Sequence, residues 1–251
     1  MLIHNLKHKI KAMKLDILAI GVHPDDVELS CSGTLLRHIK NGKTVGLLDL
    51  TKGELGTRGS AELRTEEAMI AAEMMGAKVR EQLDLADGFF TQNEADLRKI
   101  ITIIRRYQPE IVLCNSVEDR HPDHGRAAKM AADACFLSGL RRVETVENDG
   151  TLQAVWRPKT VYHYIQDRAL TPDFVVDISE FVERKFELIM AYKSQFFDPL
   201  SNEPATPISG QSFLDSIRGK DAVYGRYVGV AYAEGFIAGR TVGVKDLFDL
   251  M

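Results

Sequence analysis

Short runs of consecutive apolar residues alternate along this chain with stretches in which apolar residues recur every three or four positions. Residues 15–22 (Leu-Asp-Ile-Leu-Ala-Ile-Gly-Val) are almost continuously apolar, which is the pattern of a strand buried on both faces of a sheet. Similar runs occupy 45–50 and 111–115, and later strands are predicted at 160–165 and 174–178. These runs predict the strands of a buried sheet.

Helices are predicted between the strands from capping residues and apolar stripes. The first helix ends at Asn41-Gly42, because glycine readily adopts the left-handed conformation that ends helices. The second is capped by Ser60 and stops at Gly76, and later helices are predicted to begin at Asn93, after His124 and at Ser179. Because strands and helices alternate, we predict an α/β protein, a Rossmann-like three-layer fold with a mostly parallel sheet and helices on both faces.

The organisation along the chain indicates one domain. Residues 1–13 are basic and interrupted by charges, so we interpret them as an N-terminal arm, with Met13 as an alternative translation start to Met1. Residues 14–251 are expected to form a single domain. The segment 197–212 is rich in Pro, Ser and Gly, but the piece beyond it is too short to build a core of its own.

Composition and charge exclude several classes of function. A net charge of −4 offers no electrostatic footprint for nucleic acid, and no apolar run reaches the roughly 20 residues that cross a bilayer. Cys31, Cys114 and Cys135 lack CxxC spacing, so we expect buried thiols and neither a disulfide framework nor a thiolate zinc site. We therefore expect a cytoplasmic protein whose partner is a small molecule, not nucleic acid or a membrane.

Two tetrapeptides rich in metal-binding side chains follow predicted strands. His23-Pro24-Asp25-Asp26 comes after the first strand, and His121-Pro122-Asp123-His124 comes after the run at 111–115. Ligands of parallel α/β sheets bind at the carboxyl ends of the strands, so the two tetrapeptides are predicted to meet at one edge. Either one alone is equally typical of a Pro-Asp turn, but together they predict a functional site.

The residue types suit a metal-dependent hydrolase. A catalytic zinc takes three nitrogen or oxygen ligands from the protein and keeps an open position, and it lowers the pKa of bound water from 15.7 to about 7. One carboxylate off the metal would accept the proton of that water, and a spare imidazole would face the oxyanion. Two histidines and one carboxylate also form the facial triad of non-haem iron oxygenases. Iron(II), an oxygenase and a non-catalytic binding protein therefore stay open as alternatives.

Residues 21–28 (Gly-Val-His-Pro-Asp-Asp-Val-Glu) and 120–124 (Arg-His-Pro-Asp-His) resemble the two signature motifs of the LmbE/PIG-L deacetylase superfamily. Further matches lie at 51–57, 192–196 and 232–236, so the resemblance covers nearly the whole chain. It is strongest to the bacillithiol-biosynthesis branch, which removes acetate from N-acetylglucosaminyl malate. The resemblance implies a zinc-dependent N-deacetylase of an amino-sugar compound, with an amidase of thiol conjugates as the alternative. It also implies a homo-oligomer, with a hexamer as the candidate assembly.

The resemblance assigns a role to each motif residue. It implies metal ligands at His23, Asp26 and His124 and a general base at Asp25. His121 matches the imidazole that stabilises the oxyanion and acts as acid, and Asp123 matches a carboxylate that orients a histidine. Asp119 and Arg120 stand where the mycothiol branch has a tyrosine, which weakens the transfer of that branch's mechanism.

Several cationic side chains lie in or next to the predicted site loops, namely Lys52, Arg58, Arg64, Arg120 and Arg126. A guanidinium group can hold a carboxylate through two parallel hydrogen bonds. Arg64 matches a substrate-binding position of the family, and we predict that it contacts the substrate. Arg120 is a second candidate for contact with the substrate. Pairing with a nearby acidic side chain is nevertheless the simpler role for Arg120, and also for Lys52, Arg58 and Arg126.

Overall fold

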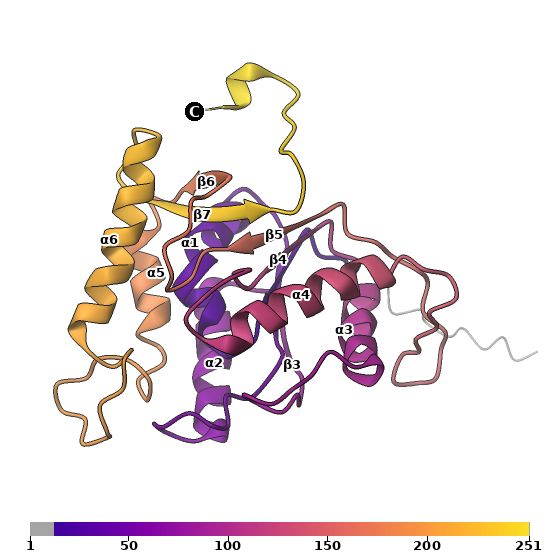
Figure 1. Cartoon of the computed structure of the whole chain (residues 1–251), viewed down its shortest axis with the longest axis horizontal. Helices are drawn as coiled ribbons and strands as arrows, with labels where there is room; N and C mark the ends of the chain where they lie inside the picture. The colour runs from indigo at the N-terminus through magenta and orange to yellow at the C-terminus, as the bar shows by residue number, and fades with distance from the viewer. Residues whose placement is uncertain (1–12, 251) are drawn as a thin grey trace, which may run out of the picture.

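A seven-stranded sheet forms the middle layer of the protein (Figure 1). The computed structural model describes residues 13–250, so the predicted N-terminal arm falls, except for Met13, outside the described residues. The strands are β1 (Ile17–Gly21), β2 (Val45–Asp49), β3 (Val79–Gln82), β4 (Ile111–Cys114), β5 (Thr160–Tyr164), β6 (Phe174–Asp177) and β7 (Ala233–Ala238), in the order β3-β2-β1-β4-β5-β7-β6. Neighbours from β3 to β5 are parallel, whereas β7 is antiparallel to both β5 and β6. The prediction of a mostly parallel sheet is confirmed.

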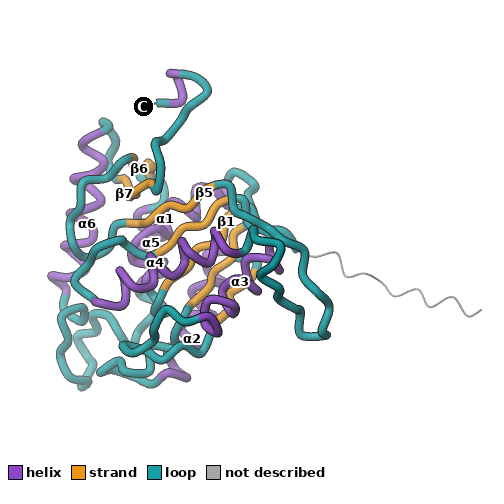
Figure 2. Tube along the Cα trace, turned by 45° about the vertical axis from the view of Figure 1, so that its right-hand side comes forward, coloured by secondary structure: helices purple, strands orange, loops and turns teal. Residues whose placement is uncertain are grey.

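Helices cover both faces of this sheet (Figure 2). They are α1 (Asp26–Lys40), α2 (Ala61–Met75), α3 (Glu94–Tyr107), α4 (Pro122–Leu137), α5 (Val182–Ile189) and α6 (Gln211–Tyr227), followed by the 3-10 turn η1 (Leu247–Asp249). Successive side chains of β1 point to opposite faces of the sheet, which explains the two helical layers. Leu18 and Ile20 pack with α3 and α4, whereas Ile17 and Ala19 pack with α1 and α2. The three-layer α/β prediction is confirmed.

Most predicted helix ends are present, but α4 begins at Pro122 and not after His124, and one predicted cap is wrong. The Ser60 hydroxyl accepts a hydrogen bond from the Leu63 amide at 3.2 Å, and Gly76 ends α2 with a φ of 84°. Asn93 caps α3 in the same way. The predicted cap at Ser179 is wrong, because α5 begins only at Val182 and the Ser179 hydroxyl donates to Asp177 at 2.7 Å.

Three elements were not predicted from the pattern. β3 is a four-residue strand (Val-Arg-Glu-Gln) at the edge of the sheet, α6 begins within the last residues of the polar segment 197–212, and β7 comes after it. β7 inserts between β5 and β6, so the last part of the chain completes the same sheet. Within residues 13–250, no helix is long and apolar enough to cross a membrane. The three cysteines are buried and free, as predicted.

Candidate metal-dependent active site

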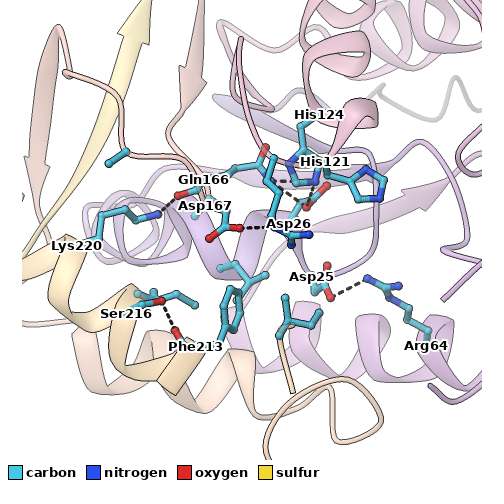
Figure 3. Close-up of a pocket in the computed structure, with 16 residues that line it drawn as sticks. Asp25, Asp26, Arg64, His121, His124, Gln166, Asp167, Phe213, Ser216 and Lys220 are labelled. Carbon is cyan, nitrogen blue, oxygen red and sulfur yellow. Dashed lines mark hydrogen bonds and ion pairs between the residues drawn. The ribbon is translucent and has the colours of Figure 1, made fainter. Parts of the chain in front are cut away.

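The two histidine-containing motifs occupy the loops that leave β1 and β4. β1 ends at Gly21 and α1 begins at Asp26, whereas β4 ends at Cys114 and His121 caps the start of α4. β1 and β4 are paired neighbours, so the motifs meet at one edge of the sheet. Figure 3 shows Asp26, His121 and His124 grouped above Asp25 and Arg64.

Two imidazoles flank Asp26, and each is fixed from behind by another carboxylate. His124 Nε2 lies 3.2 Å from Asp26 Oδ1, and its Nδ1 lies 2.5 Å from Asp119. His23 Nδ1 lies 3.8 Å from Asp26 Oδ2, and its Nε2 lies 2.9 Å from Asp87. Metal-ligating histidines typically have their outer nitrogen held by a carboxylate in this way. The donor set of His23, Asp26 and His124 therefore fits a metal ion.

Asp26 itself is held by a set of buried donors. Its Oδ2 accepts from the His23 amide at 2.9 Å and from Asn115 Nδ2 at 3.0 Å, and its Oδ1 accepts from Gln166 Nε2 at 3.0 Å. Burial opposes ionisation, but His124, His23 and the hydrogen bond from the His23 amide hold the pKa of Asp26 well below its usual range. Asp26 is thus a fixed carboxylate, as a metal ligand needs to be.

The carboxylates around the two flanking imidazoles raise the pKa of both. Burial lowers the pKa of His124, but Asp26 and Asp119 outweigh it and raise that pKa to about 10. The pKa of His23 rises to about 9, because hydrogen bonds with Asp123 and Asp87 outweigh burial. The carboxylates around His23 and His124 therefore favour a positive charge at both rings. A bound metal ion would have to displace the protons from the nitrogens that ligate it.

His121 is a third imidazole at the same place. Its ring lies 4.8 Å from that of His23 and is stacked 5.2 Å from that of His124. Ligating nitrogens of the three histidines lie within 4.8 Å of one another, so three imidazoles form a second possible donor set. The His121 Nδ1 accepts from the Asp123 amide at 3.3 Å, which leaves Nε2 for a proton. Burial and the two neighbouring imidazoles lower the pKa of His121.

Asp25 lines the cavity beside this cluster and is held by Arg64. It has a φ of 115°, a backbone conformation that costs a non-glycine residue about 1–3 kcal/mol and is kept only where the surroundings impose it. Arg64 imposes it here, because its Nε donates to the Pro24 carbonyl at 2.9 Å and its Nη2 to Asp25 Oδ2 at 2.7 Å. Burial raises the pKa of Asp25 to about 7 although Arg64 opposes the shift. A carboxylate with a pKa near neutrality suits a general base.

The remaining predicted residues differ in how they reach the site. Asp123 is fully buried, lies 3.5 Å from His23 Nε2 and accepts from the Gly88 amide at 2.8 Å, so it can orient His23. Arg120 is half exposed and pairs with Asp167 at 2.6 Å on the rim. Arg58 and Arg126 bind backbone carbonyls of neighbouring loops; Arg126 also pairs with Asp123 and so balances an acid as expected, whereas Arg58 pairs with no acid of residues 13–250.

Several residues of the site were not identified from the sequence as such. Asn115 directly follows β4, and Gln166 is the second residue after β5; the rule that ligands bind at carboxyl ends of strands would have found both. Asp119 precedes the second motif and was considered only as a replacement for a tyrosine. Asp87 belongs to the loop after β3, and no local signal identifies it.

A cavity of about 330 Å³ opens beside the cluster. Asp25, Asp26, His121 and His124 line one end of it. The opposite end is formed by α6 and the segment before it, which contribute Ile208, Phe213, Ile217 and Lys220 (Figure 3). Substrate-sized space therefore adjoins the candidate metal site.

Comparison with known proteins agrees with this geometry. The sequence profile of the PIG-L family, described as GlcNAc-PI de-N-acetylase, matches residues 18–135. The chain is 29% identical to a diacetylchitobiose deacetylase of Thermococcus kodakarensis, over 87% of this chain and 81% of that protein. It is 26% identical to a 4-oxalmesaconate hydratase of Pseudomonas putida, over 71% of this chain and 73% of that protein.

A solved structure is similar over almost its whole length. The conserved protein TT1542 of Thermus thermophilus superposes with a TM-score of 0.80 and 32% identity, covering 92% of this chain and 98% of that one. Both signature motifs, at 21–28 and 120–124, lie inside the segment that the family profile matches. The chain belongs to the PIG-L (LmbE-like) deacetylase family.

Proposed function

We propose that this protein is a zinc-dependent N-deacetylase that removes acetate from an N-acetylglucosamine-type compound, and that its substrate is N-acetylglucosaminyl malate. One observation carries the proposal: a buried Asp25, paired with Arg64, lines the same cavity as Asp26, His121 and His124. An oxygenase has no use for that additional base, whereas amide hydrolysis needs it.

The proposed roles follow from what each side chain touches. His23, Asp26 and His124 would hold the ion, with Asp87 and Asp119 fixing the outer nitrogens of the two histidines. A zinc ion in this position would polarise the acetyl carbonyl and make water a better nucleophile near neutral pH. Family membership, the deacetylase activity of the Thermococcus relative and the approach of His23 and His124 to Asp26 support this assignment.

The protein's own residues would move the protons. Asp25, held by Arg64, accepts a proton from the water that attacks the acetyl carbon. His121, whose Nδ1 accepts from the Asp123 amide, donates a hydrogen bond from Nε2 to the oxyanion, and the proton taken up by Asp25 passes to the departing nitrogen. The new C–O bond forms, the C–N bond breaks, and acetate and the free amine leave. The oxyanion contact and the general base are the usual contributors to such catalysis.

The activity is tested by measuring acetate and free amine released from N-acetylglucosamine, its methyl glycoside, diacetylchitobiose and N-acetylglucosaminyl malate. We expect equal amounts of acetate and amine, with the highest kcat/KM for the malyl compound. Because one relative is a hydratase, the same preparation is assayed with 4-oxalmesaconate. Hydration of that acid without release of acetate from any sugar would overturn the proposal, and so would oxygen consumption with an iron-loaded preparation.

A further inference from the structure

Lys220 lies in the wall of the cavity and carries a positive charge. Among residues 13–250, no carboxylate forms an ion pair with it. Its ammonium group donates to the backbone carbonyls of Ile165, at 3.2 Å, and of Gln166. The nearest acidic side chain along α6, Asp221, is committed to Lys185 at 2.7 Å, and Glu234 pairs with that same lysine at 2.9 Å. A lysine has three donors, so Lys220 keeps one for a ligand.

Lys220 and the metal-binding cluster lie at different ends of the same cavity. It projects from α6 toward Gln166, on the other side of the cavity from Asp25 and Arg64 (Figure 3). The Gln166 side chain in turn donates to Asp26 at 3.0 Å. Burial lowers the pKa of Lys220 to about 8, so the group is still mostly charged at pH 7. A partly buried charge without an anionic partner is costly unless a ligand supplies one.

The other cations around the cavity are already engaged. Arg64 binds Asp25 and the Pro24 carbonyl, and Arg120 pairs with Asp167. Ile217 and Phe213, about one and two turns before Lys220 on α6, add an apolar wall to the same cavity. Phe213 is stacked on Phe196 at 6.2 Å, which fixes the orientation of that wall. The far end of the cavity thus combines a carbon-binding surface with one available positive charge.

We propose that Lys220 is a specificity residue that binds a carboxylate on the aglycone of the substrate, while Phe213 and Ile217 pack against the aglycone's carbon skeleton. This inference rests on the proposed deacetylase function and specifies which residue selects an acidic substrate. Lys220 acts on binding and positioning, and it takes no part in the bond-making steps. A charge-assisted hydrogen bond of this kind contributes about 10- to 100-fold to selection between an acidic and a neutral ligand.

The test compares kcat/KM for N-acetylglucosaminyl malate and for the neutral methyl N-acetylglucosaminide in wild type, Lys220→Gln and Lys220→Arg. Glutamine keeps a donor for the two backbone carbonyls but removes the charge, so a purely structural role would be largely rescued. We expect Lys220→Gln to lose at least about tenfold more on the malyl than on the methyl substrate, mainly through KM. Lys220→Arg, which keeps the charge, should retain more of the preference.

Controls separate this inference from the function on which it rests. Lys129→Met removes an exposed lysine of α4 that pairs with Asp133, and it should leave the preference for the malyl substrate unchanged. Equal losses on both substrates in Lys220→Gln, with or without a lower melting temperature, would overturn the inference. An equally large loss on diacetylchitobiose would do the same, because that ligand offers hydroxyls and no carboxylate. Absence of acetate from every substrate with the wild-type protein would instead refute the deacetylase proposal.

Discussion

At the scale of single residues, the site is built from side chains whose partners come from distant parts of the chain. His124 is oriented by Asp119 within its own loop, but His23 is oriented by Asp87 and Asp123. The motif positions indicated which residues carry the chemistry, because both motifs follow buried strands and therefore reach the same edge of the sheet. It could not indicate Asp87, whose role depends on how the loop after β3 folds back onto β1.

Arg64 illustrates the same limit. The sequence placed it near the start of a helix beside the metal-bearing edge, and the structure does so. Its Nε and Nη2 nevertheless bind Pro24 and Asp25, so the structure favours a role in positioning the base. Contact of Arg64 with substrate stays a prediction, and so does that of Arg120.

Replacing Asp25 by asparagine tests the assignment of the general base. The amide has the same size and can still pair with the Pro24–Arg64 arrangement, but it cannot accept a proton. We expect the variant to bind metal like wild type and to lose about 10²–10⁴-fold in kcat. Metal content and acetate release are measured on the same sample. Near-normal turnover would assign the proton transfer to Asp123 or to solvent.

Replacing Asp119 by asparagine tests whether His124 is a metal ligand oriented from behind. The carboxylate lies 2.5 Å from His124 Nδ1, and partners of this kind contribute about 10- to 100-fold to metal affinity or activity. We expect a weaker Kd for zinc in Asp119→Asn and loss of binding in His124→Ala. Asp133→Asn, farther along α4, serves as the control. Full metal occupancy in His124→Ala would show that the ligand assignment is wrong.

At the scale of elements, the predictable parts of the fold are those with strong local signals. β1, β2 and β4 are continuous apolar runs, and α2 and α3 begin at residues whose side chains cap them. β3 escaped prediction because its four residues are mostly polar and half buried, as an edge strand allows. β7 contains Glu234 and Gly235, and it is stabilised by pairing with β5 and β6 and not by a local pattern. The failed cap at Ser179 has the same origin, since that hydroxyl contacts Asp177 and not the helix.

One buried ion network joins α5, α6 and β7. Lys185 has no exposed side-chain surface and contacts Asp221 and Glu234, and Glu234 also accepts from the Gly33 and Thr34 amides of α1. Two carboxylates without their cation would be costly at this depth. The network therefore holds the last third of the chain, including the helix that carries Lys220, against the rest of the fold.

Lys185→Met should lower the free energy of unfolding by about 3–5 kcal/mol. The matched control is Lys40→Met, which removes an exposed pair with Glu180 at 3.0 Å and should change that free energy by about 0–1 kcal/mol. Urea unfolding followed by circular dichroism measures both. Equal, small effects of the two substitutions would show that the buried network does not stabilise the fold.

At the scale of the whole molecule, the arrangement follows from the sheet. Parallel strands bring both motif loops to one edge, and the antiparallel β7 brings α6 to the side of that edge, where it closes the cavity. The segment after β7 extends from the body and exposes Phe248 to 96%. The homo-oligomer and the cytoplasmic location expected from the sequence stay predictions.

The central claim is that acetate release depends on one metal ion held by His23, Asp26 and His124. The most direct measurement titrates metal-free protein with zinc while following acetate release from N-acetylglucosaminyl malate. The account predicts that activity is absent without metal, rises in proportion to added zinc and levels off at one ion per chain. Full acetate release by protein shown by elemental analysis to be free of metal would contradict it.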